Sequence, residues 1–159
     1  MTKDVYSFSH SLELGAGGGL VGLAIALALG ESSTSHIEIT DQMQLLALMQ
    51  HNIKLNELPT ELVSASVLDW GASSFQEPPD VLLAADCVYF EPAFPLLLVT
   101  MKQLIGLNTI CYFCFKKRRN ADLHFVKDLK KSFKVEDIMD DPDRPVWSRE
   151  RLFLYVLFS

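Results

Sequence analysis

Short apolar segments alternate with longer ones along the whole chain of 159 residues. Apolar runs of about four to eight residues between turn-forming residues are typical of strands, and longer periodic runs are typical of helices. On this pattern we expect strands near residues 10–14, 36–40, 62–67, 80–86, 109–115, 133–138 and 151–157. We expect helices near residues 19–29, 42–55, 92–105 and 120–132. This alternation predicts an α/β fold in which helices cover both faces of a parallel sheet.

Turn-forming residues mark several of these boundaries. Gly30 ends the first expected helix, Asp41 is suited to cap the second, and Pro59 follows it. The run at 81–85 is apolar on both faces, as a central parallel strand should be. An acidic, proline-containing loop at 140–145 joins the last two strands in place of a helix, so we expect the final strand to be antiparallel.

Composition narrows the class of protein. The chain is 49% hydrophobic and carries a net charge of −6, which favours a globular protein and argues against general nucleic-acid binding. The start lacks the pattern of a secretory signal, and the longest apolar run, at 20–29, is too short to span a bilayer. We therefore expect one cytoplasmic, monomeric domain over residues 1–159 that needs no membrane partner.

A glycine-rich turn follows the first expected strand. The stretch from Leu12 to Leu20 is a short strand that contains Glu13, then a glycine turn, then an apolar helix. Glycine lets backbone approach a ligand closely because it has no Cβ and tolerates positive φ. Ligands of open α/β sheets bind at the carboxyl ends of the strands. The sequence therefore predicts a nucleotide-like cofactor at residues 13–22.

Two cofactors fit this turn. Residues 17–22, with Gly17, Gly19 and Gly22, match the GxGxxG pattern of dinucleotide-binding proteins. Residues 15–19 match the GxGxG of S-adenosylmethionine-dependent methyltransferases. Glu13 favours the second, because a carboxylate attracts an ammonium and a sulfonium but repels a pyrophosphate. A nicotinamide-dependent oxidoreductase stays the alternative.

Acidic and aromatic residues follow the other expected strands. Asp41 ends the second strand, where it can accept hydrogen bonds from ribose hydroxyls or cap the next helix. Trp70 follows the third, where it can pack on an adenine or on the core. Asp86 closes the fourth, where it can position an incoming amine or cap a helix, and Tyr89 can wall an aliphatic channel. Asp80 begins that strand at the far end and is interpreted as structural.

Other reactive side chains do not form a convincing site. Cys111 and Cys114 make a CxxC pattern, but residues three apart on a strand point to opposite faces, so we expect buried thiols and no metal site. The histidines, His10, His36, His51 and His124, are scattered. The basic run at 116–119 follows the fifth strand, where it can face an acidic protein surface or simply solvate a helix entry.

Taken in order, several motifs resemble the family-16 seven-strand protein-lysine methyltransferases. They are Glu13-Leu14-Gly15-Ala16-Gly17, Leu20-Val21-Gly22-Leu23, Thr40-Asp41, Asn52, Trp70-Gly71 and Ala84-Ala85-Asp86-Cys87-Val88-Tyr89. The step from Asp86 to Tyr89 is similar to the family's [DE]xx[YF] signature. Segments at 93–97 and 116–122 also look like those of fungal members that methylate translation elongation factor 1-alpha.

The resemblance implies a Rossmann-like methyltransferase fold with S-adenosylmethionine as cofactor and a protein as substrate, namely translation elongation factor 1-alpha. The residues expected to bind the cofactor are Glu13, Gly15, Ala16, Gly17, Asp41, Trp70 and Ala85. Asp86 and Tyr89 are expected to face the lysine channel as the catalytic residues. Because family members carry a segment before the first strand, we expect an N-terminally truncated domain, and a non-catalytic binding module stays a second alternative.

Overall fold

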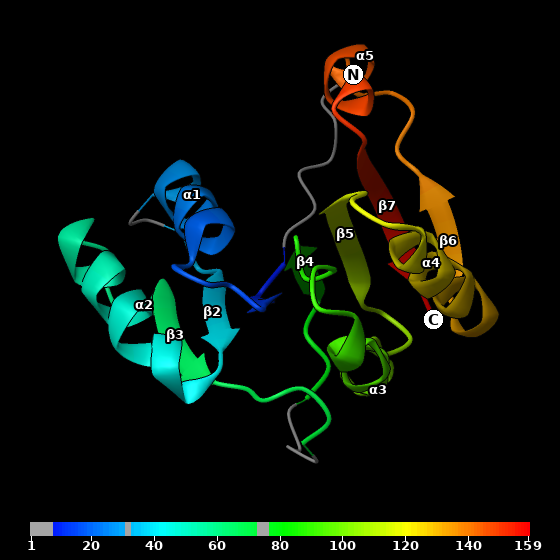
Figure 1. Cartoon of the computed structure of the whole chain (residues 1–159). Helices are drawn as coiled ribbons and strands as arrows, with labels where there is room; N and C mark the ends of the chain where they lie inside the picture. Colours follow the sequence, from blue (N-terminus) through cyan, green and yellow to red (C-terminus); the bar gives the residue numbers. More distant parts are fainter. Residues whose placement is uncertain (1–7, 31–32, 73–76) are drawn as a thin grey trace.

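The computed structural model describes residues 8–30, 33–72 and 77–159, which form one seven-stranded sheet flanked by helices (Figure 1). The strands are β1 (His10–Leu14), β2 (His36–Asp41), β3 (Val63–Val67), β4 (Val81–Ala85), β5 (Ile110–Lys116), β6 (Lys134–Asp137) and β7 (Leu152–Phe158). The helices are α1 (Leu20–Leu29), α2 (Met43–Leu55), α3 (Phe94–Leu104), α4 (Asn120–Ser132) and α5 (Arg144–Arg149), and a 3-10 turn, η1 (Glu91–Ala93), precedes α3.

The strand order is β3-β2-β1-β4-β5-β7-β6. The first five strands run parallel, and β7 pairs antiparallel with both β5 and β6. This arrangement confirms the expected Rossmann-like sheet and its antiparallel final strand. Because parallel strands end at one edge, the turns after β1, β2, β3 and β4 gather there.

One local expectation was wrong, and the structure excludes two alternative capping roles. The connection between β6 and β7 contains the short helix α5, with Pro145 in its first turn, a position where proline loses no hydrogen bond. Asp41 does not cap α2: it is the last residue of β2, and Gln42 is the capping residue, without a side-chain cap bond. Asp86 caps no helix either, since Phe90 is the residue before η1.

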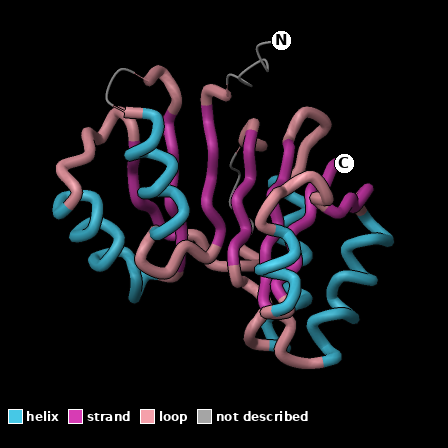
Figure 2. The backbone as a smooth tube through the Cα atoms, turned by 90° about the horizontal axis from the view of Figure 1, so that it is seen from above, coloured by secondary structure: helices cyan, strands magenta, loops and turns pink. Residues whose placement is uncertain are grey.

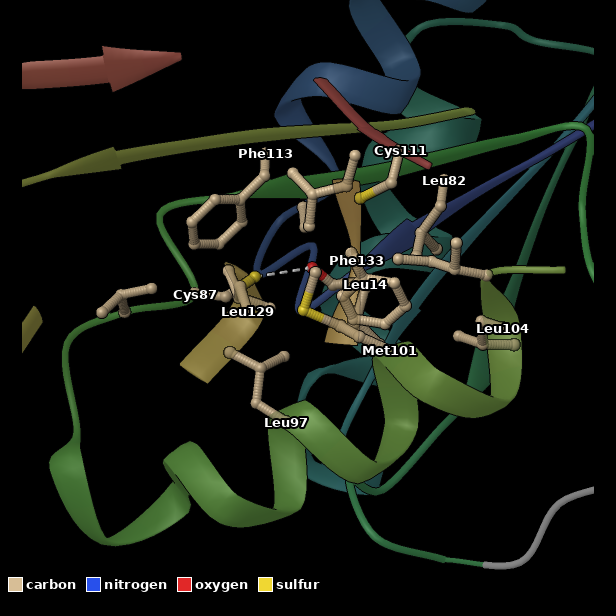
Figure 3. Close-up of a cluster of buried hydrophobic side chains, with 14 of the residues drawn as sticks. Leu14, Leu82, Cys87, Leu97, Met101, Leu104, Cys111, Phe113, Leu129 and Phe133 are labelled. Carbon is tan, nitrogen blue, oxygen red and sulfur yellow. Dashed lines mark hydrogen bonds between the residues drawn. The ribbon is translucent and has the colours of Figure 1, made fainter. Parts of the chain in front are cut away.

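The buried side chains form two clusters on opposite faces of the sheet. The larger lies between α3, α4 and strands β1, β4, β5 and β7, and includes Leu14, Leu82, Phe113 and Leu129 (Figure 3). The smaller lies between α1, α2 and strands β2 and β3. The helices therefore flank the sheet on both sides, as the tube view in Figure 2 shows.

Within the described residues, each half of the sheet has one face without a helix. The open face of β2 and β3 is polar, with His36 bonded to Ser64 and Ser66 bonded to Glu38. The open face of β4 and β5 is apolar: Val81, Leu83, Ile110 and Tyr112 line a hollow of about 410 Å³, which Ile25 of α1 borders on one side together with Phe8 and Ser11, and Tyr112 is 40% exposed. We call these four residues the open apolar face. None of the helices in the described ranges has the length and apolarity needed to cross a membrane.

Candidate functional site

A cavity of about 230 Å³ lies at the carboxyl ends of the parallel strands. It is lined by Gly15, Asp41, Gln42, Leu68, Trp70, Tyr89, Phe90 and Ala93, which follow or end β1, β2, β3 and β4. The structure thus brings four of the predicted site residues, Gly15, Asp41, Trp70 and Tyr89, to one cavity. Its volume is slightly below the roughly 300–1,000 Å³ of typical small-molecule sites, so a ligand the size of a nucleoside derivative would extend beyond it.

The glycine turn after β1 forms one wall of this cavity. Gly15 has φ +65°, and a Cβ there would lie 2.9 Å from Cζ2 of Trp70. A side chain at this position would therefore displace the indole ring as well as strain the backbone. Gly17 has φ +59°, and a Cβ there would meet nothing within 4 Å. The backbone at Gly17 is thus open to a ligand.

Asp41 joins the end of β2 to the glycine turn. Its Oδ2 accepts a hydrogen bond of 2.7 Å from the backbone N–H of Gly17, and its Oδ1 accepts one of 2.7 Å from Gln42. A carboxylate can accept about four hydrogen bonds, so each oxygen keeps capacity for a ligand hydroxyl. The arrangement explains why Asp41 is not a helix cap and suits it to hold a ribose.

Glu13 lies next to the cavity but does not line it. Its side chain is only 2% exposed, and its Oε2 accepts a 2.8 Å hydrogen bond from the backbone N–H of Gly22 near the start of α1. Burial raises the pKa of Glu13 from 4.5 to about 7, against the opposing effect of the Gly22 bond. Its expected contact with the cofactor stays a prediction. Asn52 braces the same turn from α2 by donating to the carbonyl of Gly18.

Trp70 lies between the cavity and the core, and its contact with an adenine stays a prediction. Its ring lies against Gly15 and lines the cavity, and it also packs against the larger buried cluster. The next residue, Gly71, has φ +82° and donates a 2.8 Å hydrogen bond to Oγ1 of Thr100 on α3. This bond fixes the segment that presents the indole ring.

The segment after β4 carries Asp86 and Tyr89. Asp86 has φ +54°, and its two carboxylate oxygens each accept a 2.8 Å hydrogen bond from the guanidinium of Arg118. Tyr89 is 62% exposed and lines the cavity. The thiol of Cys87 donates to the carbonyl of Leu14 at 3.0 Å, drawn as a dashed line in Figure 3, and so ties this segment to the end of β1.

The remaining predicted cofactor residues, Ala16, Gly17 and Ala85, do not line the cavity; Ala16 and Gly17 directly follow Gly15, which does. Their contacts with a cofactor stay predictions.

Of two expectations about residues outside the site, the one for Asp80 is confirmed and the one for the cysteines is confirmed only for Cys111. Asp80 is structural: its carboxylate accepts hydrogen bonds from Ser9 and His10, and these bonds lower its pKa. Cys111 is fully buried in the larger cluster, whereas Cys114 is partly exposed on the other face of β5. Burial raises the pKa of both thiols.

Sequence reasoning missed several residues of the site. Gln42, Leu68, Phe90 and Ala93 also line the cavity. Each of them lies within four residues of a position that was identified, so extending each rim motif by a few residues would have found them. The contacts of the basic run at 116–119 were not foreseen, because its partners are distant in sequence.

Comparison with known proteins adds an independent line of evidence. The family model described as "Lysine methyltransferase" matches residues 1–132. The chain is 39% identical to protein-lysine N-methyltransferase EFM6 of Saccharomyces cerevisiae, across 94% of this chain and 67% of the relative. It is 36% identical to EEF1A lysine methyltransferase 3 of Mus musculus, across 83% of this chain and 56% of the relative. The chain thus spans about half to two thirds of the length of these curated relatives.

The solved structures show the same fold at low sequence identity. An O-methyltransferase family protein from Burkholderia thailandensis superimposes with a TM-score of 0.69 at 13% identity, covering 95% of this chain and 51% of that protein. The family model matches residues 1–132, which is more than half of the chain. The chain therefore belongs to the lysine methyltransferase family.

Proposed function

We propose that this chain transfers a methyl group from S-adenosylmethionine to a lysine side chain of a protein. The observation that carries the proposal is that Gly15, Asp41, Trp70 and Tyr89 line one cavity, with Asp86 outside its lining and three residues before Tyr89. Family membership and the names of the relatives support the same activity.

The residues present fit this cofactor. Trp70 supplies an aromatic surface suited to adenine, and Asp41 supplies free acceptor capacity for two ribose hydroxyls. The open backbone at Gly17 leaves room for the rest of the molecule. When bound, S-adenosylmethionine supplies a methyl group that passes to a neutral amine, while sulfur keeps the electron pair of the broken carbon–sulfur bond.

The chain's own residues prepare the substrate amine. The Asp86 carboxylate attracts the lysine side chain and orients its nitrogen. Tyr89 and Phe90, exposed at 62% and 56%, would enclose the aliphatic part of the lysine and exclude water. Such desolvation lowers the pKa of an amine, so the nitrogen loses its proton to solvent and keeps a lone pair for the reaction. Positioning and desolvation, without a dedicated base, then account for the catalysis.

The substrate we propose is translation elongation factor 1-alpha, because a mouse relative is named for this protein. A monomeric state and a cytoplasmic location, expected from the sequence, stay predictions.

Calorimetric titration with S-adenosylhomocysteine tests the cofactor site. We expect micromolar binding by the wild-type chain and an affinity at least about 10-fold weaker for Gly15→Ala, a change of about 1.4 kcal/mol, because the new methyl group displaces Trp70. Gly30→Ala is the matched control: Gly30 also has positive φ, φ +75°, and open space around it, but it ends α1 away from the cavity. Its affinity should equal that of the wild type.

Transfer of a labelled methyl group to purified elongation factor 1-alpha tests the activity. A folded chain that binds no S-adenosylhomocysteine would instead support the non-catalytic binding module. Binding of NADH in its place would support the nicotinamide-dependent alternative.

A further inference from the structure

Two neighbouring arginines hold the two proposed catalytic residues. They belong to the turn between β5 and α4. The guanidinium of Arg118 donates a 2.8 Å hydrogen bond to each carboxylate oxygen of Asp86. Nη2 of Arg119 donates a 2.6 Å hydrogen bond to the carbonyl of Tyr89. The mechanism proposed above assigns no role to either arginine.

A buried carboxylate sets the position of this turn. Asp122, in the first turn of α4, is completely buried. Its Oδ2 accepts hydrogen bonds from the backbone N–H groups of Arg118, at 2.7 Å, and Arg119, at 2.8 Å. The backbone N–H of Asp86 donates in turn to the carbonyl of Cys114 on β5 at 2.7 Å. Hydrogen bonds thus hold the backbone of Asp86 to β5 and the backbone of Arg118 to the start of α4, directly after β5.

Stability alone does not account for the ion pair. The side chains of Arg118 and Asp86 are 41% and 55% exposed, and exposed pairs usually contribute only about 0–1 kcal/mol. The two parallel hydrogen bonds of an arginine–carboxylate fork do, however, fix the orientation of the carboxylate. The pair therefore matters for geometry and charge at the site more than for folding.

The charge of Asp86 has opposite effects on binding of the substrate lysine and on its deprotonation. A free carboxylate would attract the substrate ammonium, but it would also favour the charged form of that amine and hold back its lone pair. The other groups around Asp86 do not offset this charge: the thiols of Cys87 and Cys114 stay neutral because burial raises their pKa, and Arg119 is directed to Tyr89 and Asp122. Arg118 is the cation in direct contact.

We propose that Arg118 is a positioning residue that orients Asp86 and balances its charge, so that the carboxylate places the substrate amine without stabilising its ammonium form. This inference rests on the proposed methyltransferase function. Arg119 supports it by fixing the backbone at Tyr89.

The test measures kcat and KM for methylation of purified elongation factor 1-alpha from pH 6.5 to 10. It compares wild type, Arg118→Ala and Arg118→Lys. In Arg118→Ala, we expect kcat at pH 7.5 to fall about 10-fold and KM to stay equal or decrease, since the freed carboxylate binds the ammonium better. The rising limb of its kcat–pH profile should move about one pH unit upward. This is the smallest shift expected in the pKa of an amine a few ångströms from an unbalanced carboxylate charge. Arg118→Lys keeps the charge but loses the fork, so its profile should stay at the wild-type pH with a reduced kcat.

Lys116→Ala is the matched control, because Lys116 precedes the same turn and makes an exposed pair with Glu150 at 3.7 Å. Its profile should equal that of the wild type. If Arg118→Ala behaves like Lys116→Ala, or loses kcat with no change in its pH profile, the inference is wrong while the proposed function stands. If the wild-type chain neither binds S-adenosylhomocysteine nor methylates protein, the proposed function fails and the inference with it. If Arg118→Ala does not fold, Arg118→Gln, which also removes the charge, supplies the pH profile, and the same upward shift is expected.

Discussion

The carboxyl group of Glu13 is buried between β1 and the start of α1, where the backbone N–H of Gly22 donates a hydrogen bond to it. Its pKa is raised from 4.5 to about 7 because burial disfavours the charged form. Between these two values the folded chain holds a proton that the unfolded chain has released. Stability from this group is therefore complete below pH 4.5 and is lost as the pH rises to about 7.

We expect Glu13→Gln to remove this pH dependence, because the amide oxygen can still accept the Gly22 hydrogen bond and cannot ionise. Urea unfolding of both proteins at pH 4.5, 6, 7 and 8 provides the measurement. The free energy of unfolding of wild type minus that of the variant should fall by about 3 kcal/mol across this range. A difference that does not change with pH would show that the carboxyl group titrates normally.

Which residues of the site could be predicted depended on how local their partners are. The glycine turn and the rim positions Asp41, Trp70, Asp86 and Tyr89 follow from strand ends, which local patterns mark. Their hydrogen-bond partners do not, because Gly17 is 24 residues from Asp41 and Arg118 is 32 residues from Asp86. The sequence therefore identified the carboxylates but not the groups that hold them.

At the scale of elements, the long strands and helices matched their expected ranges because burial on a defined face makes their patterns strong. The α4 range was predicted at its observed bounds, 120–132. The short helix α5 was missed, because six residues with a proline and no buried side chain give no helical period. The start of α2 was equally hidden, because the Asp41 carboxylate bonds to Gly17, 24 residues away, and Gln42 is the capping residue.

The start of α4 depends on Asp122, whose buried carboxylate accepts the N–H groups of Arg118 and Arg119. Asp122→Ala would leave both donors without this partner, so we expect a loss of about 1–3 kcal/mol in the free energy of unfolding. The matched control is Asp128→Ala on the same helix, which removes only an exposed pair with Lys131 and should be nearly neutral. Thermal unfolding of wild type, Asp122→Ala and Asp128→Ala measures both changes in stability. Equal melting temperatures for the two variants would contradict the role of Asp122.

At the scale of the whole molecule, the two halves of the sheet are covered from opposite sides, and the two faces left open differ in character. The pattern of apolar residues showed that β4 is apolar on both faces, but it could not show on which face the described helices pack. The side on which a helix packs depends on chain path and not on local sequence. The open apolar face is therefore a property of the assembled sheet.

We expect this face to bind apolar dyes and to promote self-association. Tyr112→Lys would place a charge at its most exposed strand position and should lower both ANS fluorescence and light scattering, with unfolding free energy changed by less than about 1 kcal/mol. Leu107→Lys is the matched control, since Leu107 is 93% exposed in a turn and away from the face. If both variants scatter light alike, the face does not drive association.

The position of β7 also determines how late in synthesis the sheet can finish pairing. This strand lies between β5 and β6, and β7 is the strand with which β6 pairs. Residues 134–137 are therefore made before the neighbour that holds them exists, and a nascent chain keeps one edge of β5 unpaired until residues 152–158 have left the ribosome. Until then the edge of β5 is free to pair with other chains.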